Sequence, residues 1–226
     1  NVAILAGETK FIATDGGGSG GVVYDVLTDL SVNGFSNDGD YKSVTAGTSN
    51  LVLGVNAGNS IASGGNYNVT VGDEAGTAIT TGDNNVGIGF QALTSSTTAL
   101  NNVAVGSEAG DAITTGSSNT ALGYQSLSAL QDGAANTAIG RGALAVNTAS
   151  NNTAVGRGAL EANTSAANNT AVGKSALTAN TTGTGLVGVG YNSLAANTTG
   201  DHNVALGYNA LDANTEGDKN TGLGTS

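Results

Sequence analysis

The sequence predicts an all-β fold, a parallel β-solenoid of about eleven stacked coils. Three observations predict it. Glycines recur at nearly constant spacing, a short alternating apolar segment precedes each of them, and asparagine stands four residues before the glycine in ten of eleven copies. Sequences that repeat at a fixed period stack one supersecondary unit per repeat. The repeats occupy residues 46–226, and residues 1–45 do not follow them.

The recurring glycines, called anchor glycines below, define the register of the repeat. Eight of their ten intervals are 17 residues long, one is 18 and one is 16. The anchors are Gly54, Gly72, Gly89, Gly106, Gly123, Gly140, Gly156, Gly173, Gly190, Gly207 and Gly224. Unrelated loops would not produce this regularity, so each interval is interpreted as one coil.

The residues around each anchor predict a short strand followed by a turn. An aliphatic residue such as Val105 precedes the anchor, Val or Thr stands two positions earlier, and the residue between them is small. This alternation predicts a strand with one aliphatic face. Most coils carry a leucine such as Leu144 four residues after the anchor, whereas three coils carry Gly there and Ile three residues later, as at Gly110 and Ile113. We interpret this exchange as a way to keep the volume of the core constant in coils whose turns have two different geometries.

Asparagine and a second glycine mark the predicted corners of each coil. Residues such as Asn136 and Asn169 tolerate left-handed backbone, and stacked amides can form a ladder. Glycines ten residues after an anchor, such as Gly116, indicate positive φ or close backbone approach. We therefore expect two short strands and two corners per coil, with coils about 4.8 Å apart. Because such thin coils bury little apolar area, we expect identical chains to share a core formed by the aliphatic residues before the anchors and the leucines after them.

Composition excludes several classes of protein. The 226 residues include 37 Gly and no Pro, Cys, Met or Trp, which is unlike a globular domain with a mixed core. A net charge of −11 with six basic residues argues against nucleic acid as a partner. The absence of Cys removes disulfides and thiolate metal sites. No apolar run is long enough to span a bilayer, so we expect no membrane insertion in this segment.

Residues 1–45 are predicted to form an N-terminal β-rich capping or transition segment. It combines apolar Val2–Leu5, glycine-rich Gly16–Gly21 and a β-rich run, Val22–Val32. A solenoid needs an atypical end that protects its open edge. The chain contains no Met and stops just after Gly224, so we expect the natural chain to be longer.

Two segments carry a resemblance to a known family. Asn152–Gly156 and Asn169–Gly173 both read Asn-Thr-Ala-Val-Gly, and an Ala-Leu pair follows each of them. They resemble the head repeats of trimeric autotransporter adhesins and the similar repeats of bacteriophage tail fibres. The resemblance covers about residues 46–226 and implies a left-handed β-roll, a homotrimer around a common axis, and attachment to host or cell surfaces. The family's usual repeat is shorter, and the longer form here, as in Ala195–Gly200, resembles the phage fibres more closely. The matching positions are scaffold, so no binding residue is carried over.

Residues that could support catalysis or metal binding are few. His202, the single histidine, stands beside Asp201 in a predicted corner and is interpreted as a solvated turn residue. Asp73–Glu74 and the pair Glu108 and Asp111 could approach a calcium ion, but the glycine-aspartate nonapeptide of calcium-binding β-rolls is absent. We predict no catalytic residue, no cofactor and no metal, and hence no enzyme.

One column of residues follows the anchors directly and is called the surface column below. It consists of Tyr124, Arg141, Arg157, Lys174, Tyr191 and Tyr208. It holds three of the six basic residues of an acidic chain. Aromatic and basic groups in line could stack on sugar rings and pair with anionic groups of a cell-surface glycan. The alternative is that they shield an outer edge or line a seam between chains.

The sequence therefore predicts a non-enzymatic, structural and adhesive segment of an extracellular fibre. The leading hypothesis is a bacteriophage tail fibre on the virion surface that contributes to host attachment, and the alternative is the head of a bacterial trimeric surface adhesin. Two minor hypotheses remain. An ice-binding solenoid would use pairs such as Thr181–Thr182, although neighbouring side chains in a strand point to opposite faces. A polysaccharide-degrading solenoid would need carboxylates clustered in one cleft.

Overall fold

A computed structural model describes residues 2–3, 12–14, 23–25 and 45–225. The chain divides into two compact units, Asn1–Tyr41 and Lys42–Ser226. In the first unit three short strands form an antiparallel sheet in the order β1-β2-β3. These strands are β1 (Val2–Ala3), β2 (Ile12–Thr14) and β3 (Val23–Asp25). The glycine-rich segment Gly16–Gly21 lies outside the described residues, and the capping role stays a prediction.

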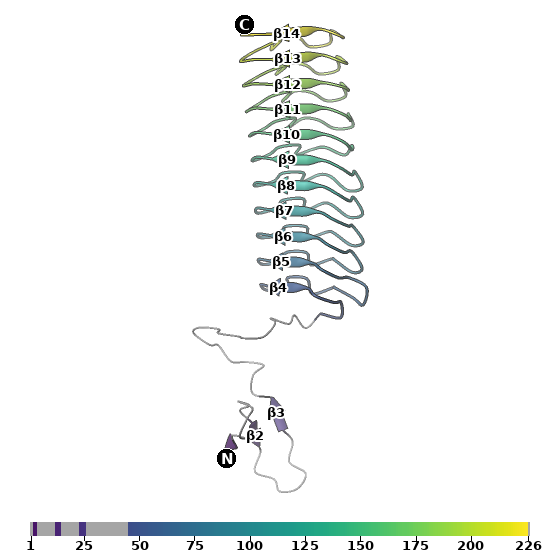
Figure 1. Ribbon diagram of the computed structural model, residues 1–226, viewed down its shortest axis with the longest axis vertical. Coiled ribbons are helices and arrows are strands. Elements are labelled where there is room, and N and C mark those ends of the chain that lie inside the picture. The colour runs from purple at the N-terminus through teal and green to yellow at the C-terminus, as the bar shows by residue number, and fades with distance from the viewer. Residues whose placement is uncertain (1, 4–11, 15–22, 26–44, 226) are drawn as a thin grey trace. The chain divides into compact units, whose positions relative to one another are not determined.

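The second unit is a parallel β-solenoid with one strand per coil (Figure 1). Eleven strands of three residues pair in chain order to form one sheet. They are β4 (Leu51–Leu53), β5 (Val69–Val71), β6 (Val86–Ile88), β7 (Val103–Val105), β8 (Thr120–Leu122), β9 (Thr137–Ile139), β10 (Thr153–Val155), β11 (Thr170–Val172), β12 (Val187–Val189), β13 (Val204–Leu206) and β14 (Thr221–Leu223). Equivalent residues of successive coils pair directly, so the predicted all-β solenoid with coils of about 17 residues is confirmed.

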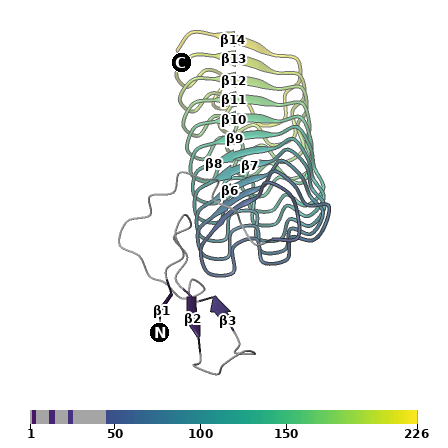
Figure 2. The same ribbon diagram turned by 60° about the horizontal axis from the view of Figure 1, so that its bottom comes forward.

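The rest of each coil is built from turns, and these turns also stack on one another (Figure 2). Within residues 45–225 no second strand forms, so the expectation of two strands per coil is wrong. The reason lies in two residues of the turn, such as Gln125 and Leu127, which both have φ of 54° and leave the β region. Hydrogen bonds between coils still satisfy the turn backbone, as when the Leu127 N–H donates to the Ala143 carbonyl over 3.1 Å.

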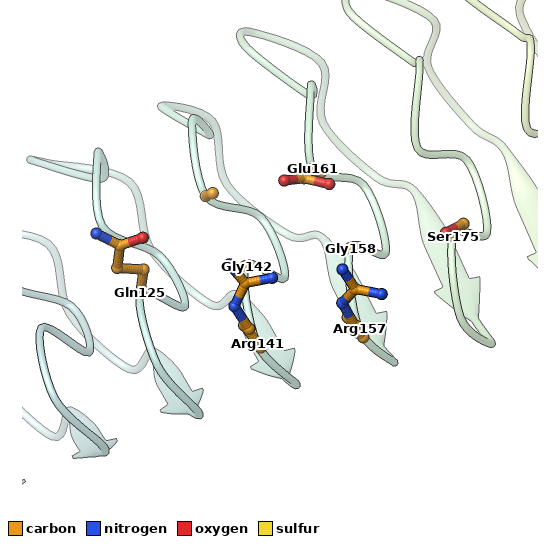
Figure 3. A pocket seen from close by; sticks show the side chains of 8 residues that line it. Gln125, Arg141, Gly142, Arg157, Gly158, Glu161 and Ser175 are labelled. Carbon is orange, nitrogen blue, oxygen red and sulfur yellow. The ribbon is translucent and has the colours of Figure 1, made fainter.

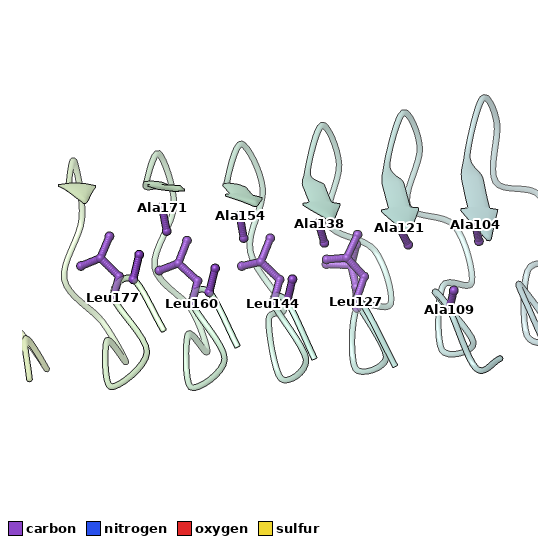
Figure 4. Packing of buried hydrophobic residues seen from close by; sticks show 14 of the residues in the cluster. Ala104, Ala109, Ala121, Leu127, Ala138, Leu144, Ala154, Leu160, Ala171 and Leu177 are labelled. Carbon is purple, nitrogen blue, oxygen red and sulfur yellow. The ribbon is translucent and has the colours of Figure 1, made fainter. Parts of the chain in front are cut away.

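The core lies between the middle residue of each strand and the leucine of the turn (Figure 4). Ala138 and Ala154 point inward toward Leu144 and Leu160, and all four side chains are fully buried. The larger residues that flank each alanine therefore lie on the outer face, because successive side chains of a strand point to opposite faces. The prediction that the aliphatic face of the strand joins the leucines in one core is wrong. The space between strand and turn within one coil holds an alanine side chain facing a leucine side chain. The leucines are therefore buried inside their own chain.

The exchange of leucine for glycine and isoleucine keeps this core filled. Gly110 has φ of 56° and Leu127 has φ of 54°, so the turn geometry is the same in both kinds of coil, and the expectation of two geometries is wrong. A Cβ on Gly110 would lie 2.9 Å from Cδ1 of Ile113. Isoleucine seven residues after the anchor therefore occupies the space that leucine, four residues after the anchor, fills in the other coils.

Buried asparagine side chains connect successive coils, with one interruption at Leu186. The Asn136 backbone N–H donates to Oδ1 of Asn119 over 3.0 Å, and its Nδ2 donates to the same oxygen over 3.1 Å and to the Ala149 carbonyl over 2.9 Å. Each amide thus links a strand start to the opposite corner. The predicted ladder is confirmed, but the left-handed residue is the one before the asparagine, Ala135, with φ of 57°.

A second asparagine ladder runs seven residues after the anchors. Its members are Asn147, Asn163, Asn180, Asn197 and Asn214. Nδ2 of Asn163 donates to Oδ1 of Asn147 over 2.7 Å, and Asn180 repeats this bond to Asn163 over 2.9 Å. Sequence analysis missed this ladder, although its recurrence in five consecutive copies was a visible signal.

Two glycine positions of the coil are required by close backbone approach. The anchor Gly156 has φ of 138°, and a Cβ there would lie 2.4 Å from the Gly173 carbonyl oxygen. At the second corner Gly116 does not have positive φ, yet a Cβ there would lie 2.4 Å from the Gly133 carbonyl oxygen. Close backbone approach is therefore the reason for glycine at Gly116, whereas Gly64, in the first coil, has φ of 113° and no close backbone contact.

Replacing Asn169 with alanine should lower the free energy of unfolding by about 1 kcal/mol or more per chain. The change removes the amide bond to the Gly183 carbonyl and leaves the buried Leu186 N–H without its acceptor, Oδ1 of Asn169 at 2.9 Å. Urea titration followed by circular dichroism measures the change. The control is Asn59→Ala at an exposed turn position. Equal midpoints for the two variants would contradict a stabilising role for the ladder.

A double-mutant cycle should show that leucine and isoleucine compete for one volume. Gly110→Leu alone should overpack the coil against Ile113 and cost about 1–3 kcal/mol. Adding Ile113→Ser copies the neighbouring pair Leu93 and Ser96, and should recover most of that loss. Thermal unfolding measures the four proteins. Strictly additive effects would mean that the two positions do not share space.

Candidate functional site

The structure places the surface column in one line along six consecutive coils, and all six side chains are exposed. The Tyr191 and Tyr208 rings stack with centroids 5.1 Å apart and planes inclined by 13°. Nζ of Lys174 lies 5.3 Å from the Tyr191 ring centroid, and Cζ of Arg141 lies 5.9 Å from that of Tyr124. The column therefore has three consecutive cations in its middle and tyrosines at both ends, and a cation–π contact joins the cations to the tyrosines at each end.

The local backbone explains why these side chains line up. Each one follows an anchor glycine with φ between about 110° and 140°, a conformation that turns the chain away from the strand. The next residue is left-handed in successive coils, as at Gln91 with φ of 56° and Ser175 with φ of 58°. Since each coil repeats this turn, the side chains repeat at the spacing of the sheet, about 4.8 Å.

A hollow of about 150 Å³ lies beside Arg141 and Arg157 (Figure 3). Gly142 and Gly158 form part of its wall, and both occupy the left-handed position that carries a side chain in the neighbouring coils. One such side chain, Gln125, lines the end of the hollow and donates through Nε2 to Oε2 of Glu108 over 2.7 Å. Two successive glycines thus open a gap in a row of polar side chains.

The charges around the hollow are unequal. Arg141 and Arg157 come from adjacent coils and point to the same side, and Glu161 lies across from them (Figure 3). A Cβ on Gly158 would lie 2.9 Å from Oε2 of Glu161, so this carboxylate extends over the glycine. Among the described residues, no ion pair joins either guanidinium to a carboxylate. Sequence analysis identified the arginines but missed Gly142 and Gly158, whose signal was the change from a polar residue to glycine in two consecutive copies.

The other candidate residues have structural roles. His202 is exposed at a corner with φ of 57°. Asp201 accepts the Thr184 backbone N–H over 2.7 Å and its hydroxyl over 3.1 Å, and the backbone bond in particular holds the pKa of Asp201 below its usual value. Oε2 of Glu74 accepts from Nε2 of Gln91 over 2.6 Å. The described part of the chain contains no group of three or more His, Cys, Asp and Glu side chains arranged to hold a metal ion.

The fold defines this chain as an all-β solenoid repeat protein. Comparison with protein-family models, with curated proteins and with solved structures finds no match. In the residues that the structure describes, no helix has the length and apolar character that a membrane crossing requires. The surface column and the hollow beside it are the arrangement with the clearest chemistry.

Asp111 should destabilise the protein at neutral pH. Burial raises the pKa of its carboxyl, and the charge of Glu108 raises it further, while Oδ1 is buried without a hydrogen-bond partner. A carboxyl whose folded pKa is raised favours folding when protonated, so stability increases as pH falls through that pKa. Asp111→Asn should therefore raise the melting temperature near pH 7, and the difference should disappear at about pH 3, where both states are protonated.

Asp132→Asn should change the stability near pH 7 in the opposite direction to Asp111→Asn. Hydrogen bonds from the Thr115 and Thr114 side chains lower the pKa of Asp132, so its charged form favours folding above its unfolded pKa. This variant should be slightly less stable than the parent near pH 7. Melting shifts in the same direction for both variants would contradict the assignment.

Proposed function

We propose that this chain is a structural and adhesive segment of an extracellular fibre in which identical chains pack side by side. The leading form of the proposal is a bacteriophage tail fibre that contributes to host attachment, with three chains around a common axis. The observation that carries it is the outer face of the sheet, which combines regular stacking with exposed apolar side chains.

This outer face has no charged residue in strands β4–β14. Each strand contributes two outward residues, which are valine, leucine, isoleucine or threonine. Leu122 is 43% exposed, Leu206 is 51% exposed and Ile88 is 37% exposed. An exposed apolar surface that continues over many strands is typical of a surface that meets a partner.

A second copy of the same chain fits this face better than a different partner. Every strand presents two aliphatic or threonine residues on this face, so a partner must repeat at the coil spacing to match the whole surface. Another solenoid of this sequence has that repeat. Burying the outer aliphatic groups between copies is favourable by about 25 cal/mol per Å² of apolar area, and the Ala and Leu core of each chain stays intact. The resemblance to adhesin and tail-fibre repeats favours three copies.

The alternative, the head of a bacterial trimeric surface adhesin, uses the same surface and differs in what the segment is attached to. Among the minor hypotheses, ice binding is disfavoured by the threonines of the turns. The hydroxyls of Thr164 and Thr181 donate to carbonyls of the next coil over 3.1 Å and 3.0 Å, so they hold the coils together.

The purified protein should form a stable homotrimer that dissociates when charge is placed on the outer sheet face. Light scattering coupled to size exclusion measures the mass. The double variant Leu122→Asp and Leu206→Asp should yield monomers, because it buries unpaired carboxylates between chains. Thr182→Glu, an exposed turn residue, is the control and should leave the mass unchanged. A monomeric parent protein at micromolar concentration would contradict the proposed assembly.

A further inference from the structure

We infer that the hollow between Arg141 and Arg157 is a binding site for an acidic sugar residue, one that carries a carboxylate next to free hydroxyl groups. The inference deepens the proposed adhesive function, on which its biological meaning rests. It depends on the shape of the hollow, the uncompensated charge of the arginines and the position of Glu161.

The hollow results from a local change in an otherwise regular surface. In the coils before it, Gln91 and Gln125 project from the left-handed position and bond to a carboxylate of the preceding coil over 2.6 Å and 2.7 Å. At Gly142 and Gly158 this row of side chains is missing in two successive coils, which leaves a space of about 150 Å³. That volume corresponds to about five water molecules, enough for one carboxylate and the ring atoms beside it.

The two arginines are arranged to receive an anion. They lie in adjacent coils, about 4.8 Å apart along the sheet, and their guanidinium groups point to the same side of the hollow (Figure 3). Like charges at this spacing repel, and no carboxylate of the described residues forms an ion pair with them. A guanidinium presents two parallel donors that match a carboxylate, so a bound carboxylate could accept hydrogen bonds from both groups and offset their repulsion.

Glu161 distinguishes a sugar acid from a simple anion. Its carboxylate lies over Gly158, across the hollow from the arginines. It would repel a second negative group but accept hydrogen bonds from hydroxyls. Gln125 and Ser175 add polar groups at the two ends. The site therefore offers cations on one side and acceptors on the other, the pattern that a carboxylate with neighbouring hydroxyls requires.

The surface column extends the site along the solenoid. Tyr124 lies on one side of the hollow, and the stacked pair Tyr191 and Tyr208 lies beyond Lys174 on the other. Lys174 covers one face of Tyr191 and Tyr208 stacks on the other, so the rings of Tyr124 and Tyr208 are the ones that can stack against further sugar rings. We therefore expect an oligosaccharide of several acidic residues to bind more tightly than a single one.

Calorimetric titration of the full chain with oligosaccharides of galacturonic acid tests the inference. The same oligosaccharides with methyl-esterified carboxylates are the matched ligand control and should bind at least tenfold more weakly. Affinity for the acid form should fall as salt rises, because the site is exposed. Equal binding of acid and ester would overturn the inference, as would inorganic sulfate binding as tightly as the oligosaccharide.

Two kinds of variant test the site, one that removes a cation and one that fills the hollow. Arg157→Gln should weaken binding of the acid form at least tenfold, whereas Lys219→Gln removes an exposed charge away from the column and should leave binding unchanged. The double variant Gly142→Asn and Gly158→Asn keeps both arginines but fills the hollow. Asparagine occupies the same left-handed position at Asn56 and Asn192, so this variant should fold. It should also lose binding at least tenfold, and unchanged affinity would overturn the inference.

Light scattering of the same samples separates this inference from the proposed function. A trimer that does not bind the acid form leaves the fibre proposal in place and overturns the sugar site. A monomer that binds it with the expected variant pattern supports the sugar site and contradicts the fibre assembly. If Arg157→Gln reduces the assembled mass, the column lines a seam between chains, and the sugar site is wrong.

Discussion

Hydrogen bonding from each coil to the next is the constraint on which the rest of the structure depends. A strand of three residues cannot persist by itself, and here each strand between β4 and β14 pairs with equivalent residues of the coils on either side. Buried amides require the same arrangement. The Asn169 backbone N–H donates to Oδ1 of Asn152 one coil earlier, and Oδ1 of Asn169 accepts the Leu186 N–H one coil later. Any change in strand register would leave several buried polar groups unpaired.

Differences in coil length are therefore confined to the corners. The Asn136 amide reaches a carbonyl 13 residues ahead, at Ala149, whereas the Asn169 amide reaches one 14 residues ahead, at Gly183. The missing residue of the 16-residue interval thus falls in the turn before that carbonyl. Strands β9 and β10 still pair in register across it, with Thr137 opposite Thr153. A corner can absorb one residue because its backbone carries fewer obligatory partners than the sheet.

The same regularity determines where function can reside. Positions that face the interior or a ladder repeat almost unchanged, because each must match its neighbours. Positions that follow the anchors can vary, and they differ from copy to copy, from aromatic to basic residues. Arg141 and Arg157 with Gly142 and Gly158 form a local departure from the repeat that has no evident role in stacking. Such departures, in a chain whose scaffold is otherwise uniform, are the places where a specific contact with a ligand is expected.

The sequence by itself determined the coil period, the strand positions and the first asparagine ladder, because each depends on residues that recur at one spacing. It also placed the six residues of the surface column in line. Only the tertiary structure decided which side of the strand faces inward, since the alternation of Thr153, Ala154 and Val155 is compatible with either side. The outcome depends on the space left by Leu160 across the coil, which admits alanine and excludes valine. The hollow beside Arg157 likewise depends on side chains of different coils, whose proximity follows from stacking rather than from sequence order.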